Sequence, residues 1–269
     1  MADYIHSLSI TGIAAALCHA MGAEAPEHAA PPVKSLETLV HDYTHGQGAD
    51  RLFMYNPDAI GLWLYQKYTE KFDPVLRHTQ LNVPLCTVMP SVTPVCFASL
   101  YTGAQPEVHG IRKYEKPVVR TDTVFDALIR AGKRIAIIAD TGCSIAKIFL
   151  EREMDYFIYD TIEEINCKAH ELIEQDRHDM IVVYHTDYDA VMHKNGTEAD
   201  ISLQTLDKNI AAFDSFCHAI KAHWQQHNTL VGFAMDHGCH DIDNGCGSHG
   251  LDMAEDLNIL HFYGMVPAK

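Results

Sequence analysis

Apolar positions along this chain of 269 residues follow two patterns. Short continuous apolar runs are typical of strands buried on both faces, and longer segments with helical periodicity separate them. We expect strands at residues 51–56, 84–89, 134–139, 155–159, 179–185 and 229–235, the last of these being the final clear strand. We expect helices at residues 8–22, 34–45, 58–71, 94–102, 123–131, 161–175 and 201–226.

This alternation predicts an α/β fold: a doubly wound, mostly parallel sheet with helices on both faces. The chain before residue 49 differs, because two predicted helices are joined there by a proline-rich connector without recognisable chemistry. We therefore expect an N-terminal helical extension over residues 1–48 and one α/β domain over residues 49–269. The apolar helix at 8–22 would pack on that domain or on a second copy, and the second arrangement would make a homodimer.

Candidate reactive residues follow the predicted strands. Open sheets of this kind bind ligands beyond the carboxyl ends of their strands, and in a parallel sheet these ends share one edge. Three aspartates, three histidines and one hydroxyl are therefore expected to converge. They are Asp58, Thr93, Asp189, His193, Asp236, His237 and His249.

The chemistry of this set suits two divalent metal ions. Such a pair can hold a phosphoryl group, and mixed imidazole and carboxylate ligands favour zinc, with manganese as the alternative. Asp189 and His193 are four residues apart, so one turn of helix places both on one ion; Asp187 is the rival to Asp189. Thr93 precedes Pro94, which suits the N-cap of a helix whose N-terminus favours a phosphate.

Charge and cysteine content limit the partners. The formal net charge of −16 disfavours nucleic acid and anionic membranes, while a small phosphorylated substrate stays compatible because bound cations reverse the local sign. Eight scattered cysteines indicate reduced thiols and a cytoplasmic protein. No run has the roughly 18 apolar residues of a membrane-spanning helix, and the first residues lack the positive charge of a signal peptide.

The ordered set resembles the alkaline phosphatase superfamily, and most closely its type I phosphodiesterase/nucleotide pyrophosphatase branch. Residues 90–111 (PSVTPVCFASLYTGAQPEVHGI) are similar to that branch's nucleophile stretch. Residues 188–196 (YDAVMHKNG), 235–238 (MDHG) and 247–250 (GSHG) resemble its metal-ligand motifs, and the likeness runs from about residue 51 to 264.

The resemblance implies a partition of the site. One metal would be held by Asp189, His193 and His249, and the other by Asp58, Asp236 and His237. Thr93 would bind the second metal and form a phosphothreonine intermediate. Among these residues Asp58 matches the family pattern most loosely, because Asn-Pro-Asp-Ala-Ile-Gly replaces the family's Asp-Gly.

The chain departs from the nucleotide-hydrolysing members, in which an Asn downstream of the nucleophile holds a phosphoryl oxygen. No Asn lies in the predicted helix after Thr93, and Cys96 is the nearest residue with a polar group. Arg112, Lys113 and Lys116 follow that helix and would replace the Asn as donors, unless they form a solvated basic turn. The sulfatase signature Cys-x-Pro-x-Arg is absent, which disfavours sulfate esters.

These features favour a metal-dependent hydrolase of phosphate esters, with phosphodiesters slightly ahead. The same site would also suit a phosphomonoesterase or a phosphonate hydrolase. A candidate function of another class is that of a metal-stabilised binding protein without turnover. An intact nucleophile distinguishes the two classes, because a binding protein has no need of one.

Overall fold

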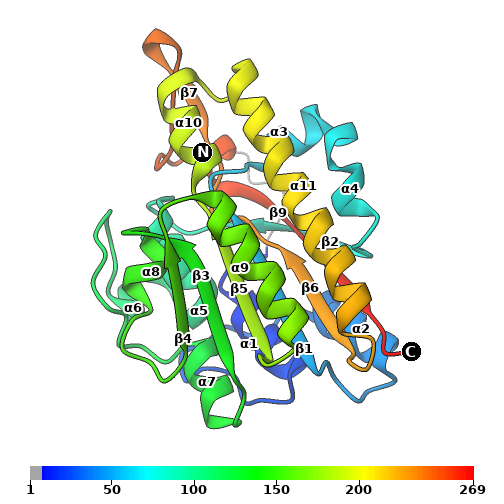
Figure 1. Cartoon of the computed structure of the whole chain (residues 1–269). Helices are drawn as coiled ribbons and strands as arrows, with labels where there is room; N and C mark the ends of the chain where they lie inside the picture. The colour runs from blue at the N-terminus through cyan, green and yellow to red at the C-terminus, as the bar shows by residue number, and fades with distance from the viewer. Residues whose placement is uncertain (1–7) are drawn as a thin grey trace.

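The computed structural model describes residues 8–269 and contains a seven-stranded mixed sheet (Figure 1). The strand order is β2-β9-β6-β1-β5-β3-β4. The strands are β1 (Arg51–Pro57), β2 (Leu81–Cys86), β3 (Ile135–Asp140), β4 (Asp155–Tyr159), β5 (Met180–His185), β6 (Thr229–Phe233) and β9 (Asn258–Val266). Only β9 runs against the others in this sheet, so the expected doubly wound, mostly parallel α/β fold is confirmed.

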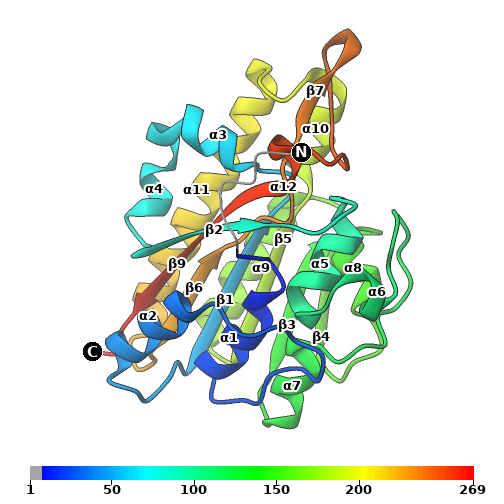
Figure 2. The ribbon, with the colours of Figure 1, turned by 180° about the vertical axis from the view of Figure 1, so that it is seen from behind.

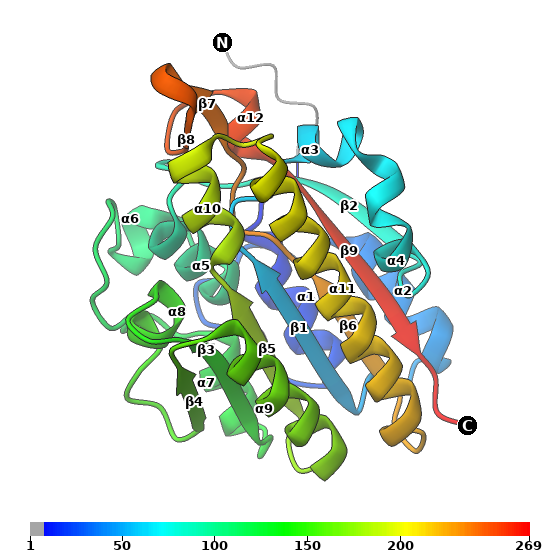
Figure 3. The ribbon, with the colours of Figure 1, turned by 45° about the horizontal axis from the view of Figure 1, so that its top comes forward.

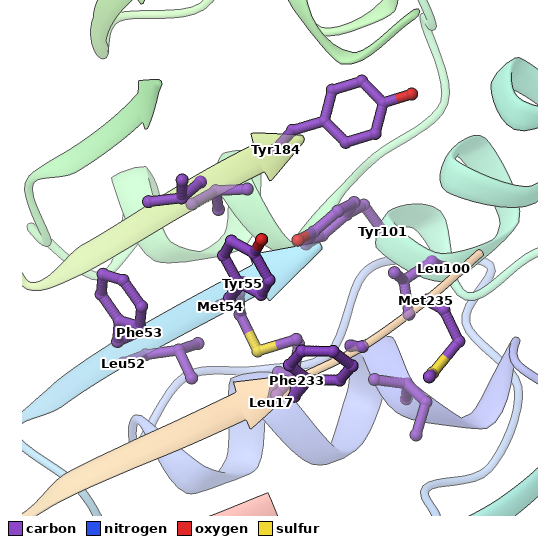
Figure 4. Close-up of a cluster of buried hydrophobic side chains, with 14 of the residues drawn as sticks. Leu17, Leu52, Phe53, Met54, Tyr55, Leu100, Tyr101, Tyr184, Phe233 and Met235 are labelled. Atoms are coloured by element: carbon purple, nitrogen blue, oxygen red, sulfur yellow. The ribbon is translucent and has the colours of Figure 1, made fainter. Parts of the chain in front are cut away.

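The centre of the sheet is buried on both faces. Every residue of β5 and β6 is buried, as is every residue of β1 after Arg51. Figure 4 shows Tyr55 of β1 beside Phe233 of β6, and their ring centroids are 5.5 Å apart. Continuous apolar runs form these strands because helices exclude water from both sides.

Helices cover the two faces of the sheet. On one face lie α9 (Ile162–Gln175) and α11 (Asp200–His223), with α3 (Leu62–Lys67) and α4 (Asp73–Leu76) beside them (Figure 1). Figure 2 shows the opposite face. It is covered by α1 (Gly12–Ala20), α2 (Lys34–Thr44), α5 (Thr93–Thr102) and α7 (Val124–Arg130).

Helix α1 is built into the core. All of its residues except His19 are buried, and it packs against α5 and α7. A side chain at Gly103, which ends α5, would bring its Cβ to 3.0 Å from Cβ of Ala14 in α1. Of the two arrangements that the sequence leaves open, packing on the body of the same chain is observed. The domain boundary at residue 48 and the homodimer stay predictions.

Several elements differ from the sequence-based expectation. Strand β9 lies beyond the predicted final strand and is inserted between β2 and β6. His261 and Gly264 break its apolar pattern, but His261 lies 2.6 Å from the Met235 carbonyl, and Gly264 passes so close to the chain that an added Cβ would lie 2.0 Å from the His78 carbonyl. Tertiary contacts therefore decide this strand.

Short elements complete the chain. The helix expected at 58–71 is divided into α3 and the 3-10 helix η1 (Thr69–Phe72), and β2 lies three residues before its expected position. The remaining elements are α6 (Pro106–His109), α8 (Ser144–Ile148), α10 (Asp187–Asn195), β7 (His240–Ile242), η2 (Asp243–Gly245), β8 (Cys246–Ser248) and α12 (Ala254–Leu257).

The strand ends meet at one edge. In Figure 3 the arrows of β1 and β5 point towards α10 and the hairpin of β7 and β8, while β9 runs the other way. Because β2 and β6 both pair antiparallel with β9, their carboxyl ends share this edge with β1 and β5. Over residues 8–269, each helix is too short or too polar to cross a membrane.

Candidate active site

Two groups of potential metal ligands lie at this carboxyl edge. Within each group the candidate ligand atoms lie within 4.8 Å of one another. The first group, called cluster 1, is Asp189, His193 and His249, and the second, called cluster 2, is Asp58, Asp236 and His237. The structure thus brings together, in the same partition, the six residues that the sequence suggests as metal ligands. The clusters are adjacent, because the rings of His237 and His249 stack with centroids 4.0 Å apart.

Cluster 1 is built on α10 and the hairpin. Asp189 and His193 are one helical turn apart, and their closest nitrogen–oxygen distance is 3.2 Å. His249 Nε2 approaches the same Asp189 oxygen at 3.4 Å. The rival Asp187 points elsewhere, since its Oδ1 accepts a hydrogen bond from Asn209 at 3.0 Å.

Cluster 2 is buried between the ends of β1 and β6. His237 Nε2 lies 3.5 Å from Asp58 Oδ1 and 3.3 Å from Asp236 Oδ2. The other oxygen of each carboxylate is held by the protein: the Tyr184 hydroxyl donates to Asp58, and the Ala59 amide donates to Asp236 at 3.2 Å. Each carboxylate is therefore fixed by one oxygen and presents the second to the cluster.

The three histidines share one orientation. The Nδ1 atoms of His193, His237 and His249 lie 3.0, 2.9 and 2.9 Å from the backbone carbonyls of residues 247, 238 and 91. A carbonyl only accepts hydrogen bonds, so each Nδ1 carries a proton, and in the neutral ring each Nε2 keeps a lone pair. Metal-bound histidines are commonly oriented in this way.

Three buried carboxylate oxygens lack a hydrogen-bond partner among the described residues. They are Asp58 Oδ1, Asp189 Oδ1 and Asp236 Oδ2, the same atoms that face the histidine Nε2 atoms. A lone pair facing a buried anionic oxygen is unfavourable, and each unpaired buried polar group is costly. A divalent cation between them would satisfy both, so this donor set fits metal ions.

Burial controls the protonation of the metal-free clusters. It raises the pKa of Asp236 to about 7, and it raises that of Asp58, helped by the charge of Asp236. It lowers the pKa of His237. Burial also acts to raise the pKa of Asp189, but the neighbouring His193 and His249 outweigh it and leave that pKa below its ordinary value. Cluster 2 therefore resists negative charge unless a cation is present.

Thr93 lies next to cluster 2. Its Oγ1 is 3.3 Å from His237 Nε2, and the residue is 3 % exposed. Helix α5 begins at Thr93 with Val92 as its N-cap, one residue earlier than expected. Thr93 therefore occupies the first turn of α5, with its hydroxyl at the helix N-terminus.

The predicted substrate-binding residues are placed unequally. The Arg112 guanidinium donates to the Glu107 carbonyl at 3.2 Å, and Lys113 pairs with Glu115 at 3.4 Å. Lys116 donates to the Gly142 carbonyl at 3.0 Å, just after β3, and so reaches the carboxyl edge. Cys96 is fully buried, with its Sγ 3.9 Å from the Val88 carbonyl. Substrate contact by these four residues stays a prediction.

Tyr184 is a site residue that sequence reasoning missed. It lies within the apolar run of β5, is 1 % exposed, and reads as an ordinary core residue. Only the register between β1 and β5, which pairs Tyr184 with Asn56, brings its hydroxyl to Asp58. No sequence spacing signals that contact.

The fold and the family match are those of the alkaline phosphatase superfamily, a class of α/β hydrolases. Within it, the chain belongs to the type I phosphodiesterase/nucleotide pyrophosphatase family, whose sequence profile matches residues 63–261. A comparison with curated proteins gives no match.

Solved structures support the fold. The murine ectonucleotide pyrophosphatase/phosphodiesterase 5 superposes with a TM-score of 0.56 at 16% identity, covering 72% of this chain and 58% of that one. Phosphonoacetate hydrolase from Sinorhizobium meliloti, in complex with phosphonoformate, gives 0.51 at 16% identity, covering 70% and 56%. The chain thus spans less than three fifths of the length of these structures.

Proposed function

We propose that this chain is a hydrolase of phosphate esters that depends on two divalent metal ions and uses Thr93 as its nucleophile. The main support is that three carboxylate oxygens without a hydrogen-bond partner among the described residues face histidine Nε2 atoms, and that one of these, His237 Nε2, lies 3.3 Å from the Thr93 hydroxyl. A binding protein without turnover would need the clusters but not this hydroxyl. Zinc suits the nitrogen and oxygen ligands best, and manganese is the alternative.

Each residue would have a distinct role. Cluster 1 and cluster 2 would each hold one ion, and the ions would supply the positive charge that lowers the pKa of the hydroxyl and neutralises phosphoryl oxygens. Thr93 Oγ1 attacks phosphorus, a new P–O bond forms, and the bond to the leaving group breaks. Water then attacks the phosphothreonine, which releases the phosphoryl product and restores Thr93. The N-terminus of α5 favours the negative charge that Thr93 attacks.

Phosphodiesters are the favoured substrates because of the family to which the chain belongs. A phosphomonoester or a phosphonate is the second candidate, and the position of Lys116 at the carboxyl edge supports it. These substrates carry more negative charge than a diester, which an ammonium group at this edge would bind. The proposed substrate is therefore a small phosphorylated or phosphonate molecule. We also propose that the protein is cytoplasmic.

The test compares hydrolysis of bis-p-nitrophenyl phosphate and p-nitrophenyl phosphate after chelation and after return of zinc or manganese. We expect metal-dependent turnover that is lost in Thr93→Ala and kept in Thr69→Ala, an exposed threonine of η1. Equal rates in the Thr93→Ala variant and the unmodified protein would refute the nucleophile. Metal binding without turnover of diesters, monoesters or phosphonates would favour the binding protein.

A further inference from the structure

Asp256, in the single turn α12, is a fully buried carboxylate that contacts neither cluster directly. His240 Nδ1 lies 2.7 Å from its Oδ1, and the Leu251 amide donates to its Oδ2 at 2.8 Å. Its main-chain carbonyl accepts a hydrogen bond from the Gly238 amide, also at 2.8 Å. One residue therefore holds three separate points of the chain.

These three points enclose the segment that joins the two clusters. Gly238 directly follows the cluster 2 ligand His237, and Leu251 lies two residues after the cluster 1 ligand His249. His240 opens β7 and pairs with Ser248 of β8, which closes the base of the hairpin between these ligands. The chain is thus tied to Asp256 on both sides of the hairpin, next to a ligand at each end.

Glu255, the residue before Asp256 in α12, lies against a further loop that carries a proposed metal ligand. A Cβ on Gly238 would lie 1.9 Å from the Glu255 carbonyl oxygen, and a Cβ on Gly61 would lie 2.9 Å from the same atom. Gly61 follows the cluster 2 ligand Asp58 by three residues. Glycine is required at Gly238 because the backbones approach too closely for a side chain. Helix α12 therefore packs against both of these ligand-bearing loops, the one that follows β1 and the one that follows β6.

We propose that Asp256 is a positioning residue that sets the relative placement of His237 and His249, and so couples the two metal sites. The proposal rests on the proposed function, because it assumes that both clusters bind metal. An ionised carboxylate accepts both the His240 and the Leu251 hydrogen bonds. An asparagine has one accepting oxygen and no charge, so it either loses one contact or keeps both only after His240 moves its proton to Nε2, and in both cases the carboxylate's charge is lost from these bonds.

The experiment measures metal binding without substrate. Zinc is titrated into the chelator-treated protein in competition with a chromogenic chelator, and bound zinc is counted by mass spectrometry. In Asp256→Asn we expect affinity to fall about tenfold at both clusters, the lower end of the loss seen for groups that bond to metal ligands directly, because Asp256 acts one residue further away. Glu255→Gln is the matched control, because it removes an exposed charge from the same turn and should bind zinc like the unmodified protein.

A second pair of variants decides the matter if Asp256→Asn does not fold. His240→Ala removes the donor to Asp256, whereas His240→Gln keeps a donating amide. We expect His240→Ala to bind zinc at least tenfold more weakly and His240→Gln to recover most of that loss. Asp256→Asn binding zinc like Glu255→Gln, or His240→Ala like His240→Gln, would overturn the positioning role alone. Unmodified protein that binds no zinc would instead overturn the proposed function.

Discussion

The clusters at the carboxyl edge can be compared with a third group on the α11 face of the sheet. His78, Asp214 and His218 also place their candidate ligand atoms within 4.8 Å of one another, and they are the same residue types. His78 follows α4, while the other two lie one turn apart on α11. Composition and proximity alone therefore do not separate the two regions.

Their hydrogen bonds separate them. His78 Nε2 lies 2.7 Å from Asp214 Oδ1, and its Nδ1 lies 2.8 Å from the Lys221 ammonium group. Both ring nitrogens are thus engaged, and a cation would have to displace one of these bonds close to the charge of Lys221. At the edge, by contrast, each Nε2 faces a carboxylate oxygen that has no hydrogen-bond partner among the described residues, and the Nε2 of His193 and of His249 contacts no cation. A histidine nitrogen that is not already bonded to a cation or a close carboxylate is therefore a better indication of a metal site than residue type.

Replacing one aspartate in each region should give the strongest contrast, and the contrast should appear in turnover. Asp236→Asn should lower metal-dependent turnover about a thousand-fold, because an ion that stabilises the transition state by about 4 kcal/mol is lost. Asp214→Asn, the matched change in the third group, should leave kcat/KM unchanged. Steady-state assays with p-nitrophenyl esters measure both, and comparable losses in the two variants would erase the distinction between the regions.

Thermal stability offers the next contrast. Zinc at about 100 times its dissociation constant should stabilise the protein by about 2.7 kcal/mol, which raises Tm by roughly 5–10 °C in a chain of this size. Differential scanning calorimetry should show this shift intact in Asp214→Asn and reduced in Asp189→Asn. A zinc-dependent shift that depends on Asp214 would assign metal binding to the third group instead.

Asp236 and His78, one from each region, should make the stability of the metal-free protein depend on pH with opposite signs. Burial raises the pKa of Asp236 to about 7, above the roughly 3.9 of an unfolded aspartate, so the native state binds more protons and the free energy of unfolding falls as pH rises from about 4 to about 7. Burial lowers the pKa of His78, so that histidine weakens the fold as pH falls through about 6.5.

Urea unfolding between pH 4.5 and 7.5 measures these slopes. In Asp236→Asn the free energy of unfolding should fall less steeply as the pH rises, because an amide does not titrate. Zinc should flatten it as well, since bound cations favour the ionised carboxylates. An unchanged slope in Asp236→Asn would contradict the assignment of this titration.

The smallest effect is expected at His218. Its side chain is 67% exposed, and its nearest carboxylate oxygen, on Asp214, is 3.7 Å away. His218→Ala should change the free energy of unfolding by no more than about 0.5 kcal/mol and leave zinc binding intact. A loss of one bound zinc in this variant would show that the third group holds metal after all.

The sheet and the residues at its edge were accessible from sequence for one physical reason. The central strands are buried on both faces and so appear as continuous apolar runs, and the polar residues that end such runs share one edge. Asp58 comes directly after β1, and Asp236 and His237 come shortly after β6.

The features that sequence did not indicate depend on contacts between distant segments. Strand β9 carries a histidine and a glycine that only its neighbours accommodate. Tyr184 reaches Asp58 across 126 residues, and Asp256 reaches His240 across 16 residues. Arg112 and Lys113 follow the nucleophile helix in sequence, but nearby groups engage both side chains. The order of residues along the chain indicates where strands end, but the register between strands decides which side chains meet.

The place of β9 also affects how the protein is made. It lies between β2 and β6, yet its residues, Asn258–Val266, are translated after both. A nascent chain on the ribosome therefore carries two strands whose shared partner does not yet exist. Unpaired strand edges recruit other chains, and long-range pairing is slow. Chaperone protection until β9 has been translated should accordingly matter more for this fold than for one whose sheet grows outward in chain order.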